Sequence, residues 1–323
     1  MSPHDATLRI WDSMVALRGF PPSEVEELWD TFAGAIENGE SSDGVELLVV
    51  RTELDATLSA RRTKARHRGG SAACKYFLDG TPFLSEEQVR DCAVISESDR
   101  LAAYEADGAV LIVAPAMALV AAGESLPQLL LSDIVENWLL CRARLNRSVQ
   151  VHCSAWIEDE KASLVVGSST AGKTTELFAS VRAGASFLSN DRAFLRVRDE
   201  RLEVRSFPLP VNIGCGTIRG LSLDLPTHGL EDDDKIRLRP KEAAERFGAD
   251  YRSWFPVHQI TCRSMDDLWQ NTLFQADPAH PFWIKPWHPG LLDEGTVHDL
   301  RSAIVGVVQV AGFEHTAAGG GPG

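Results

Sequence analysis

Apolar and polar positions in the first 125 residues follow both helical and strand patterns. Between residues 22 and 39 (PSEVEELWDTFAGAIENG) the apolar residues recur at intervals of three and four, which predicts a helix that ends at Gly39. Short runs at 45–51 (VELLVVR) and 109–115 (AVLIVAP) are rich in β-branched residues and predict strands. We therefore expect a mixed α+β region over residues 1–125.

The remainder of the chain alternates between helix and strand patterns. The successive segments are a helix over 126–146, two strands around a charged turn within 148–167, a helix over 174–184 and a strand region over 185–197. Strand–helix–strand order of this kind indicates an α/β architecture. The last residues (AAGGGPG) are typical of a flexible tail.

The composition is that of a globular protein with an acidic surface. Of 323 residues, 44% are apolar and 24% are charged; 32 Lys and Arg stand against 46 Asp and Glu, so the net charge is −14. Nucleic-acid binding depends on a basic face that neutralises phosphates, and the charge balance therefore argues against a nucleic-acid partner. The six cysteines form no C-x-x-C pair and show no zinc-ligand spacing.

Export and membrane signals are also missing from the sequence pattern. The N-terminus (MSPHDATLRIWD) lacks the basic and apolar parts of a signal peptide. The most apolar stretch, 109–122, is too short to cross a bilayer and contains Pro115. Together with the scattered thiols, these features predict a cytoplasmic protein without a membrane partner.

A phosphate-binding motif stands between a strand pattern and a helix pattern. Residues 167–174 match G-x-x-x-x-G-K-[ST] in full. The two glycines let backbone N–H groups turn toward phosphate oxygens. Lys173 supplies a cation for the β and γ phosphates, and the Thr174 hydroxyl is a ligand for Mg²⁺. The residues expected to contact ATP are Gly167, Ser168, Ser169, Thr170, Ala171, Gly172, Lys173, Thr174 and Thr175.

The stretch 167–195 (GSSTAGKTTELFASVRAGASFLSNDRAFL) resembles the core of the HPr kinase/phosphorylase family, which shares its nucleotide fold with phosphoenolpyruvate carboxykinases. In that family a short helix after the P-loop ends at a Gly, and the next strand delivers two adjacent acidic residues followed by Arg. The family also has a His in the strand before the P-loop, which His152 matches. Segment 215–221 (CGTIRGL) resembles the family's Ile-Arg-Gly-Leu segment, whose Arg, here Arg219, approaches phosphate.

The resemblance extends over residues 126–225 and implies a domain organisation. We expect an α/β P-loop kinase core of the HPr kinase/phosphoenolpyruvate carboxykinase type over 126–312. Residues 1–125 would form a mixed α+β accessory or substrate-recognition region, and 313–323 a flexible tail. Because the first 125 residues do not resemble the N-terminal domain of HPr kinases, the chain is expected to be a diverged relative with another substrate.

One position departs from the family pattern. The first of the paired acids is the family's general base, and the matching Asn190 cannot take a proton at neutral pH. Only Asp191 remains, either as a Mg²⁺ ligand or as the group that orients or deprotonates the acceptor. Phosphoryl transfer needs positioning and charge neutralisation more than a strong base, so kinase chemistry is retained whereas reverse phosphorolysis loses its acid.

Two further residues have alternative interpretations. His152 is either a core histidine or a group beside Asp191 that tunes the proton of the acceptor hydroxyl. Arg219 is either an ordinary loop arginine or a cation on the transferring phosphoryl group. The candidate catalytic residues are Asp191, His152, Arg219 and Lys173, and the candidate Mg²⁺ ligands are Thr174 and Asp191.

These residues predict an ATP- and Mg²⁺-dependent kinase that phosphorylates a hydroxyl. The acceptor is either a peptide, in the tailoring of a peptide natural product, or a small molecule. The alternatives are a non-catalytic ATP-binding regulatory module, in which Asn190 marks lost chemistry, and a serine kinase of the HPr protein. The family resemblance also implies a homo-oligomer.

Overall fold

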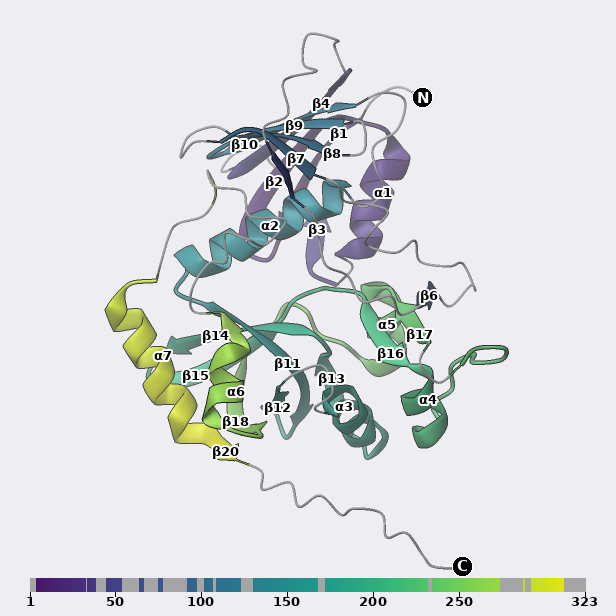
Figure 1. Cartoon of the computed structure of the whole chain (residues 1–323), viewed down its shortest axis with the longest axis vertical. Helices are drawn as coiled ribbons and strands as arrows, with labels where there is room; N and C mark the ends of the chain where they lie inside the picture. Colours follow the sequence, from purple (N-terminus) through teal and green to yellow (C-terminus); the bar gives the residue numbers. More distant parts are fainter. Residues whose placement is uncertain are drawn as a thin grey trace, which may run out of the picture.

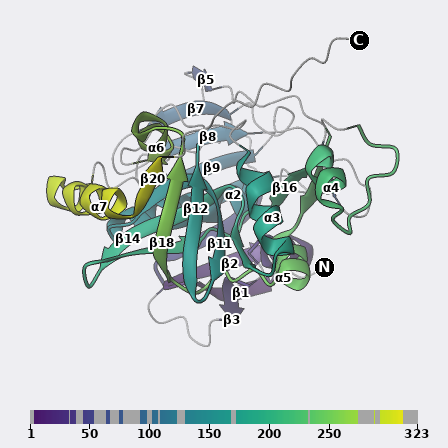
Figure 2. The same cartoon turned by 90° about the horizontal axis from the view of Figure 1, so that it is seen from below.

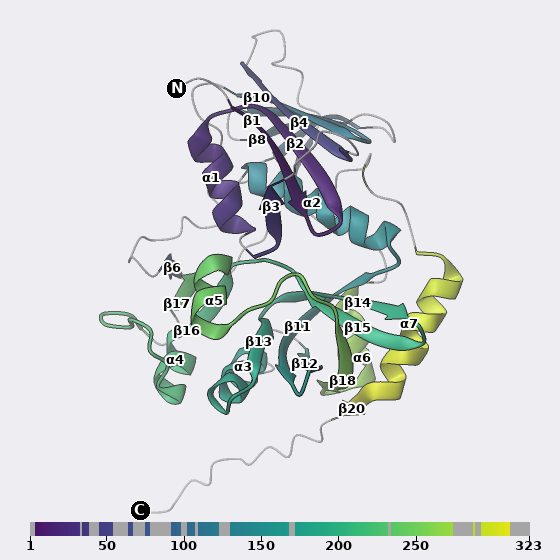
Figure 3. The same cartoon turned by 180° about the vertical axis from the view of Figure 1, so that it is seen from behind.

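Two large sheets lie one above the other in the computed structural model, with helix α2 (Leu130–Leu145) between them (Figures 1 and 3). The structure describes residues 4–32, 34–38, 45–53, 64–66, 75–77, 92–97, 102–106, 109–122, 130–167, 172–231, 234–273, 287 and 292–310. Helices and strands thus share the fold, as the predicted α/β architecture requires.

The first sheet has the strand order β3-β1-β2-β4-β10-β9-β8-β7-β5. Its strands are β1 (His4–Ile10), β2 (Ser13–Phe20), β3 (Ile36–Asn38), β4 (Leu47–Glu53), β5 (Lys64–Arg66), β7 (Cys92–Glu97), β8 (Ala102–Ala106), β9 (Ala109–Ala114) and β10 (Met117–Ala122). Neighbours are antiparallel except β2–β4 and β4–β10. A parallel pair needs a crossover, and α1 (Pro22–Thr31) lies in the one between β2 and β4. Strands β4 and β9 confirm the two strands predicted from the apolar runs.

The helix predicted over residues 22–39 is too long. The observed α1 starts with proline in its first turn and ends at Thr31. Gly34 then adopts a φ of +85°, a left-handed conformation that breaks the helix. Ile36, which carried the helical pattern onward, instead starts strand β3, pairs with Ile10 and is 4% exposed. Sheet pairing thus buries this residue.

The second sheet closes on itself. Strands β11, β12, β18, β15 and β14 pair in a ring, since β18 hydrogen-bonds to both β12 and β15. Figure 2 shows α3 at one edge of these strands and α6 and α7 at the other. The elements are β11 (Val149–Glu158), β12 (Lys161–Val166), β13 (Ser186–Ser189), β14 (Arg192–Arg198), β15 (Arg201–Ser206), β18 (Phe255–Cys262), β19 (Thr272–Leu273), β20 (Val308–Val310), α3 (Lys173–Arg182), α6 (Met265–Gln270) and α7 (Glu294–Val307).

A third, small sheet flanks α3. It consists of β16 (Val211–Gly214), β17 (Lys235–Leu238) and β6 (Lys75–Phe77), with α4 (Cys215–Leu221) and α5 (Pro240–Phe247) beside it (Figure 1). The acidic segment 231–235 ends with Lys235, the first residue of β17. Residues 232 and 233 within it, and the predicted tail over 313–323, lie outside the described residues.

One hydrophobic core joins α2 to both large sheets. Trp138 and Leu139 of α2 share a buried cluster with the first sheet, and Phe194 of β14 and Phe207, directly after β15, belong to the same cluster. The Trp11 indole N–H also donates a hydrogen bond to the Tyr251 carbonyl at 2.7 Å. The helix that the sequence assigns to the kinase core therefore packs with the first 125 residues as well, and the division at residue 125 stays a prediction. In the described part of the chain, no helix is long and apolar enough to cross a bilayer.

Candidate functional site

A β-hairpin carries the chain into the phosphate-binding motif. Strands β11 and β12 pair around a turn at Asp159 and Glu160, whose φ angles are 49° and 60°, and β12 ends one residue before Gly167. This confirms the predicted strands within 148–167. Ser168, Ser169, Thr170 and Ala171 of the motif lie outside the described residues, whereas Gly167, Gly172, Lys173, Thr174 and Thr175 are described.

Helix α3 starts directly after the motif, as predicted, and its first turn is open to an anion. Its N-cap residue Gly172 has a φ of +77°, which a glycine adopts without strain. Among the described residues, no side chain caps the first N–H groups of the helix. Unsatisfied N–H groups and the positive end of the helix dipole favour a phosphate at this position.

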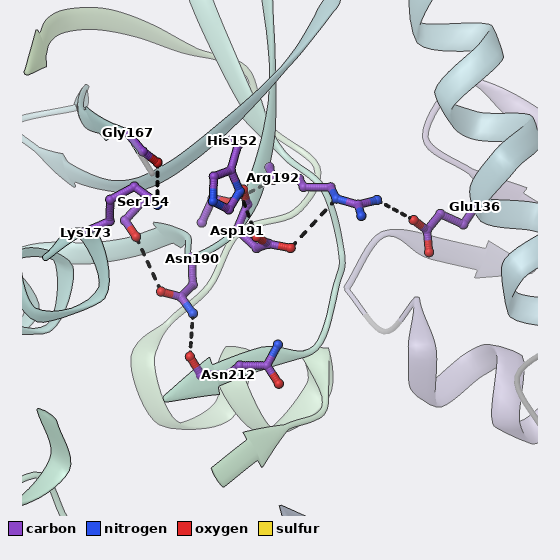
Figure 4. A network of polar contacts seen from close by, with 10 residues as sticks. Glu136, His152, Ser154, Gly167, Lys173, Asn190, Asp191, Arg192 and Asn212 are labelled. Carbon is purple, nitrogen blue, oxygen red and sulfur yellow. Dashed lines mark hydrogen bonds and ion pairs between the residues drawn. The ribbon is translucent and has the colours of Figure 1, made fainter. Parts of the chain in front are cut away.

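Lys173 folds back over the start of the motif. Its ammonium group donates a 2.6 Å hydrogen bond to the Gly167 carbonyl, and the residue is 5% exposed (Figure 4). Burial lowers the pKa of Lys173, while the negative charges of Asp191 and Asp267 oppose that shift. The arrangement therefore presents a buried cation at the N-terminus of α3, where the motif places the β and γ phosphates.

The second half of the site comes from a break between two strands. β13 and β14 both pair with β11, and residues 190–191 fall between the pairs Ala155–Ser189 and His152–Arg192. This break turns the Asp191 side chain toward His152 (Figure 4). The His152 Nδ1 atom lies 2.9 Å from Asp191 Oδ1 and 3.0 Å from the Asp191 carbonyl. Because both neighbours are acceptors, Nδ1 carries the proton in this arrangement.

Asp191 is held in its ionised form. Burial favours the protonated form, but the hydrogen bond from His152 and the charges of Arg192, His152 and Lys173 outweigh it and lower the pKa of Asp191. Arg192 also bonds Glu136 of α2 at 2.7 Å, which fixes the arginine against the helix. A carboxylate with a lowered pKa is a good cation ligand and orienting group and a weak general base.

The Asn190 amide is fixed at both ends. Its Nδ2 donates to the Asn212 carbonyl at 2.9 Å, and its Oδ1 accepts from the Ser154 hydroxyl at 3.4 Å (Figure 4). An aspartate would set a carboxylate oxygen against the Asn212 carbonyl, and two acceptors repel at this distance unless a proton lies between them. An amide is therefore the group that fits this position.

Sequence reasoning missed an acidic residue beside the lysine. Asp267 lies in the first turn of α6, directly after β18, and β18 runs parallel to β12. Its Oδ2 atom is buried without a hydrogen-bond partner among the described residues, and its charge raises the pKa of Lys173. Asn271 bonds Asp267 Oδ1 at 3.2 Å and accepts the His152 backbone N–H at 2.8 Å. Asp267 lies 94 residues after Lys173 in the sequence, and no motif links the two residues.

Arg219 contacts a different part of the chain. Its guanidinium donates to the carbonyls of Thr227 and Leu230, and these contacts tie it to the loop after α4. Helix α4 does reach the motif helix, because the Thr217 and Thr175 hydroxyls lie 3.1 Å apart. Arg219 is thus near α3 but bonded elsewhere, and its role on a phosphoryl group stays a prediction.

Magnesium would find few protein ligands here. Within the described ranges no three His, Cys, Asp or Glu side chains are grouped as metal ligands. Mg²⁺ is commonly held by one or two protein oxygens together with substrate phosphates and waters, so Thr174 and Asp191 stay the predicted ligands. When bound, the ion would neutralise charge on the phosphates.

Comparison with known proteins gives a distant structural likeness. The structure of the Hpr(Ser) kinase/phosphatase from Coxiella burnetii matches with 16% sequence identity and a TM-score of 0.22, over 35% of this chain and 63% of that protein. The match thus spans less than two thirds of the length of that protein. No protein-family model matches the chain, and no curated protein matches it in sequence. The function proposed below therefore rests on the residues of the site.

Proposed function

We propose that the protein is an ATP-dependent phosphotransferase that phosphorylates a hydroxyl group with the help of Mg²⁺. The observation that carries the proposal is that Lys173 and Asp191 lie in the same site. The buried lysine and the ionised carboxylate lie close enough for each to shift the pKa of the other, beside the uncapped start of α3. A cation for the phosphates and an anion for the metal or the acceptor are what phosphoryl transfer requires.

The charges of the site suggest a division of roles. Lys173 and the α3 N–H groups hold the phosphates, and Asp191 with Thr174 holds the cation. His152 keeps Asp191 ionised and oriented through its 2.9 Å contact. Asp191 and, to a smaller extent, Asp267 favour the protonated form of Lys173 against the effect of burial. The acceptor is a hydroxyl of a peptide or a small molecule, and a peptide natural product is one such acceptor.

Radiolabel transfer tests the proposal against the regulatory-module and HPr-kinase alternatives. The full chain is incubated with γ-labelled ATP, Mg²⁺ and candidate peptides, metabolites and HPr, and products are identified by mass spectrometry. We expect label to enter a hydroxyl of an acceptor and ATP consumption to rise in its presence. ATP that binds and stays intact with every acceptor would favour the regulatory module, and label in HPr alone would favour the HPr kinase.

The pH dependence of ATP binding is expected to report the charge of Lys173. Because burial lowers the pKa of this lysine below its ordinary 10.5, affinity should fall as pH rises through that lowered value. Asp267→Asn removes a charge that opposes this lowering of the pKa, so the fall in ATP affinity at alkaline pH, the alkaline limb of the pH profile, should begin at lower pH. Calorimetric titration of both proteins between about pH 7 and pH 10 measures the limbs. Identical limbs would show that Asp267 does not act on Lys173.

Asn190→Asp is expected to open the reverse reaction. The new carboxyl group faces the Asn212 carbonyl, and this contact together with the charge of Asp191 should raise its pKa toward neutrality. It then becomes the proton donor that phosphorolysis lacks. Phosphorylated product from the forward reaction is incubated with labelled phosphate, and labelled pyrophosphate is counted. The exposed Gln270→Glu variant controls for added charge, and label in pyrophosphate from the wild type would contradict the role given to Asn190.

A further inference from the structure

A second pocket lies at the junction of the two large sheets, away from Lys173. It is formed by the turn between β1 and β2, the C-terminal end of α2 and the β14–β15 hairpin, and its cavity volume is about 30 Å³. Its polar and aromatic lining includes Trp11, Asp12, Arg142, Arg196, Arg205 and Trp254. Arg196 stands four residues beyond Arg192 along β14, which separates the pocket from the P-loop site by roughly 13 Å of strand.

Arg205 is the unusual residue of this pocket. It is 7% exposed, its Cζ lies over the Trp11 ring at 4.2 Å and over the Trp254 ring at 4.5 Å, and its Nε is buried without a hydrogen-bond partner in the described part of the chain. Its ion pair with Asp12 is long, at 3.8 Å, and the Asp12 side chain is 79% exposed. A guanidinium buried in this way is only weakly neutralised.

The other acidic side chains around the pocket pair with the neighbouring arginines. Arg196 pairs with Glu203 at 2.8 Å, and Arg142 pairs with Glu46 at 2.5 Å. Burial lowers the pKa of Arg205 to about 10; Asp12 opposes the shift and the charge of Arg196 adds to it. Each neighbouring arginine thus has a close carboxylate, whereas Arg205 has only the long contact with Asp12; the Nε atoms of Arg205 and Arg142 are buried without a hydrogen-bond partner among the described residues.

We propose that this pocket binds a small ligand through a planar carboxylate group, held by the edge of the Arg205 guanidinium between two indole rings. The donors of a guanidinium lie in one plane and match the two oxygens of a carboxylate. The Trp11 and Trp254 rings add apolar walls for a flat organic body next to that carboxylate. The site is independent of ATP, and its ligand belongs to the organic acids.

Calorimetric titration with benzoate and succinate tests the proposal, with sulfate as the tetrahedral comparison and ionic strength held constant with KCl. Tryptophan fluorescence gives a second signal, because Trp11 and Trp254 line the pocket. We expect saturable binding of a carboxylate that weakens at least tenfold in Arg205→Gln. Arg198→Gln, an exposed arginine on the same hairpin, should bind like the wild type.

Arg205→Lys keeps the charge without the planar donor pair, so it should fold and still lose at least tenfold in affinity. This variant decides the matter if Arg205→Gln fails to fold. Absence of saturable carboxylate binding, or equal affinity in the wild type and Arg205→Lys, would leave Arg205 a structural stacking residue and overturn the proposal. Sulfate that binds as tightly as the carboxylates and depends on Arg205 would overturn the planar specificity. ATP affinity, measured alongside, should be the same in all these variants.

Discussion

Lys173→Ala is expected to weaken ATP binding at least tenfold while the protein stays folded. A hydrogen bond to a charged group contributes about 1.5–3 kcal/mol, which corresponds to roughly ten- to more than a hundredfold in affinity. The fold should tolerate the change because it removes a buried cation whose pKa is already lowered by burial. Calorimetry with ATP and Mg²⁺ measures the affinity, and circular dichroism with thermal melting checks the fold.

Two further variants make this result interpretable. Lys173→Met fills the same space without the charge, so it should lose ATP affinity to the same extent as alanine. Lys161→Ala removes an exposed lysine at the start of β12 and should leave affinity unchanged. Wild-type affinity in Lys173→Met would show that the ammonium group does not hold the phosphates, and the nucleotide site would then have to be sought elsewhere.

The local elements around the site were predictable because each follows a short-range rule. Strand patterns around a charged turn predict the β11–β12 hairpin, and the glycine-lysine motif predicts the start of α3. Neither prediction needs a residue from a distant part of the sequence. The helix over 22–39 was mispredicted because Ile36 has its partner Ile10 in a strand far from it in sequence. Periodicity within one segment carries no information on such a pairing.

The same limit applies to the candidate site. His152 and Asp191 were found because a family resemblance links them, and the structure brings them within 2.9 Å. Asp267 and Arg205 were not found, since their meaning depends on burial and on which charges surround them. An acidic residue on a short helix and an arginine on a strand are ordinary in a sequence. Only the packing makes the first a neighbour of Lys173 and leaves the second buried with one long ion pair, to the exposed Asp12.

The amide at position 190 shows how packing refines a sequence argument. From the sequence alone, Asn190 indicates only that the acidic residue of the family pattern is missing at this position. In the fold its two hydrogen bonds, to Ser154 and Asn212, use both the donor and the acceptor of the amide. The side chain thus joins β11 to β16 beside the site, and this leaves Asp191 as the carboxylate for the proposed phosphoryl transfer.

Asp191→Asn is therefore expected to abolish phosphoryl transfer while ATP still binds. The change keeps the shape of the side chain, and the contact of His152 Nδ1 with the residue 191 carbonyl at 3.0 Å remains. It removes the anion that would hold the cation and orient the acceptor, so the rate should fall by about 10²–10⁴-fold. Label transfer across a range of Mg²⁺ concentrations measures the loss of rate, and calorimetry measures the affinity for ATP.

A matched control is available on the same strand hairpin. Asp199 is likewise adjacent to an arginine in sequence, with Arg198 Nε 3.7 Å from its carboxylate, but its side chain is 91% exposed. Asp199→Asn should transfer label at the wild-type rate, so a loss confined to Asp191→Asn is specific to the site. If excess Mg²⁺ restores transfer in Asp191→Asn, the carboxylate acts as a cation ligand; if Mg²⁺ has no effect, it acts on the acceptor. Wild-type rates at every Mg²⁺ concentration would remove Asp191 from the chemistry altogether, and with it the observation on which the proposed function rests.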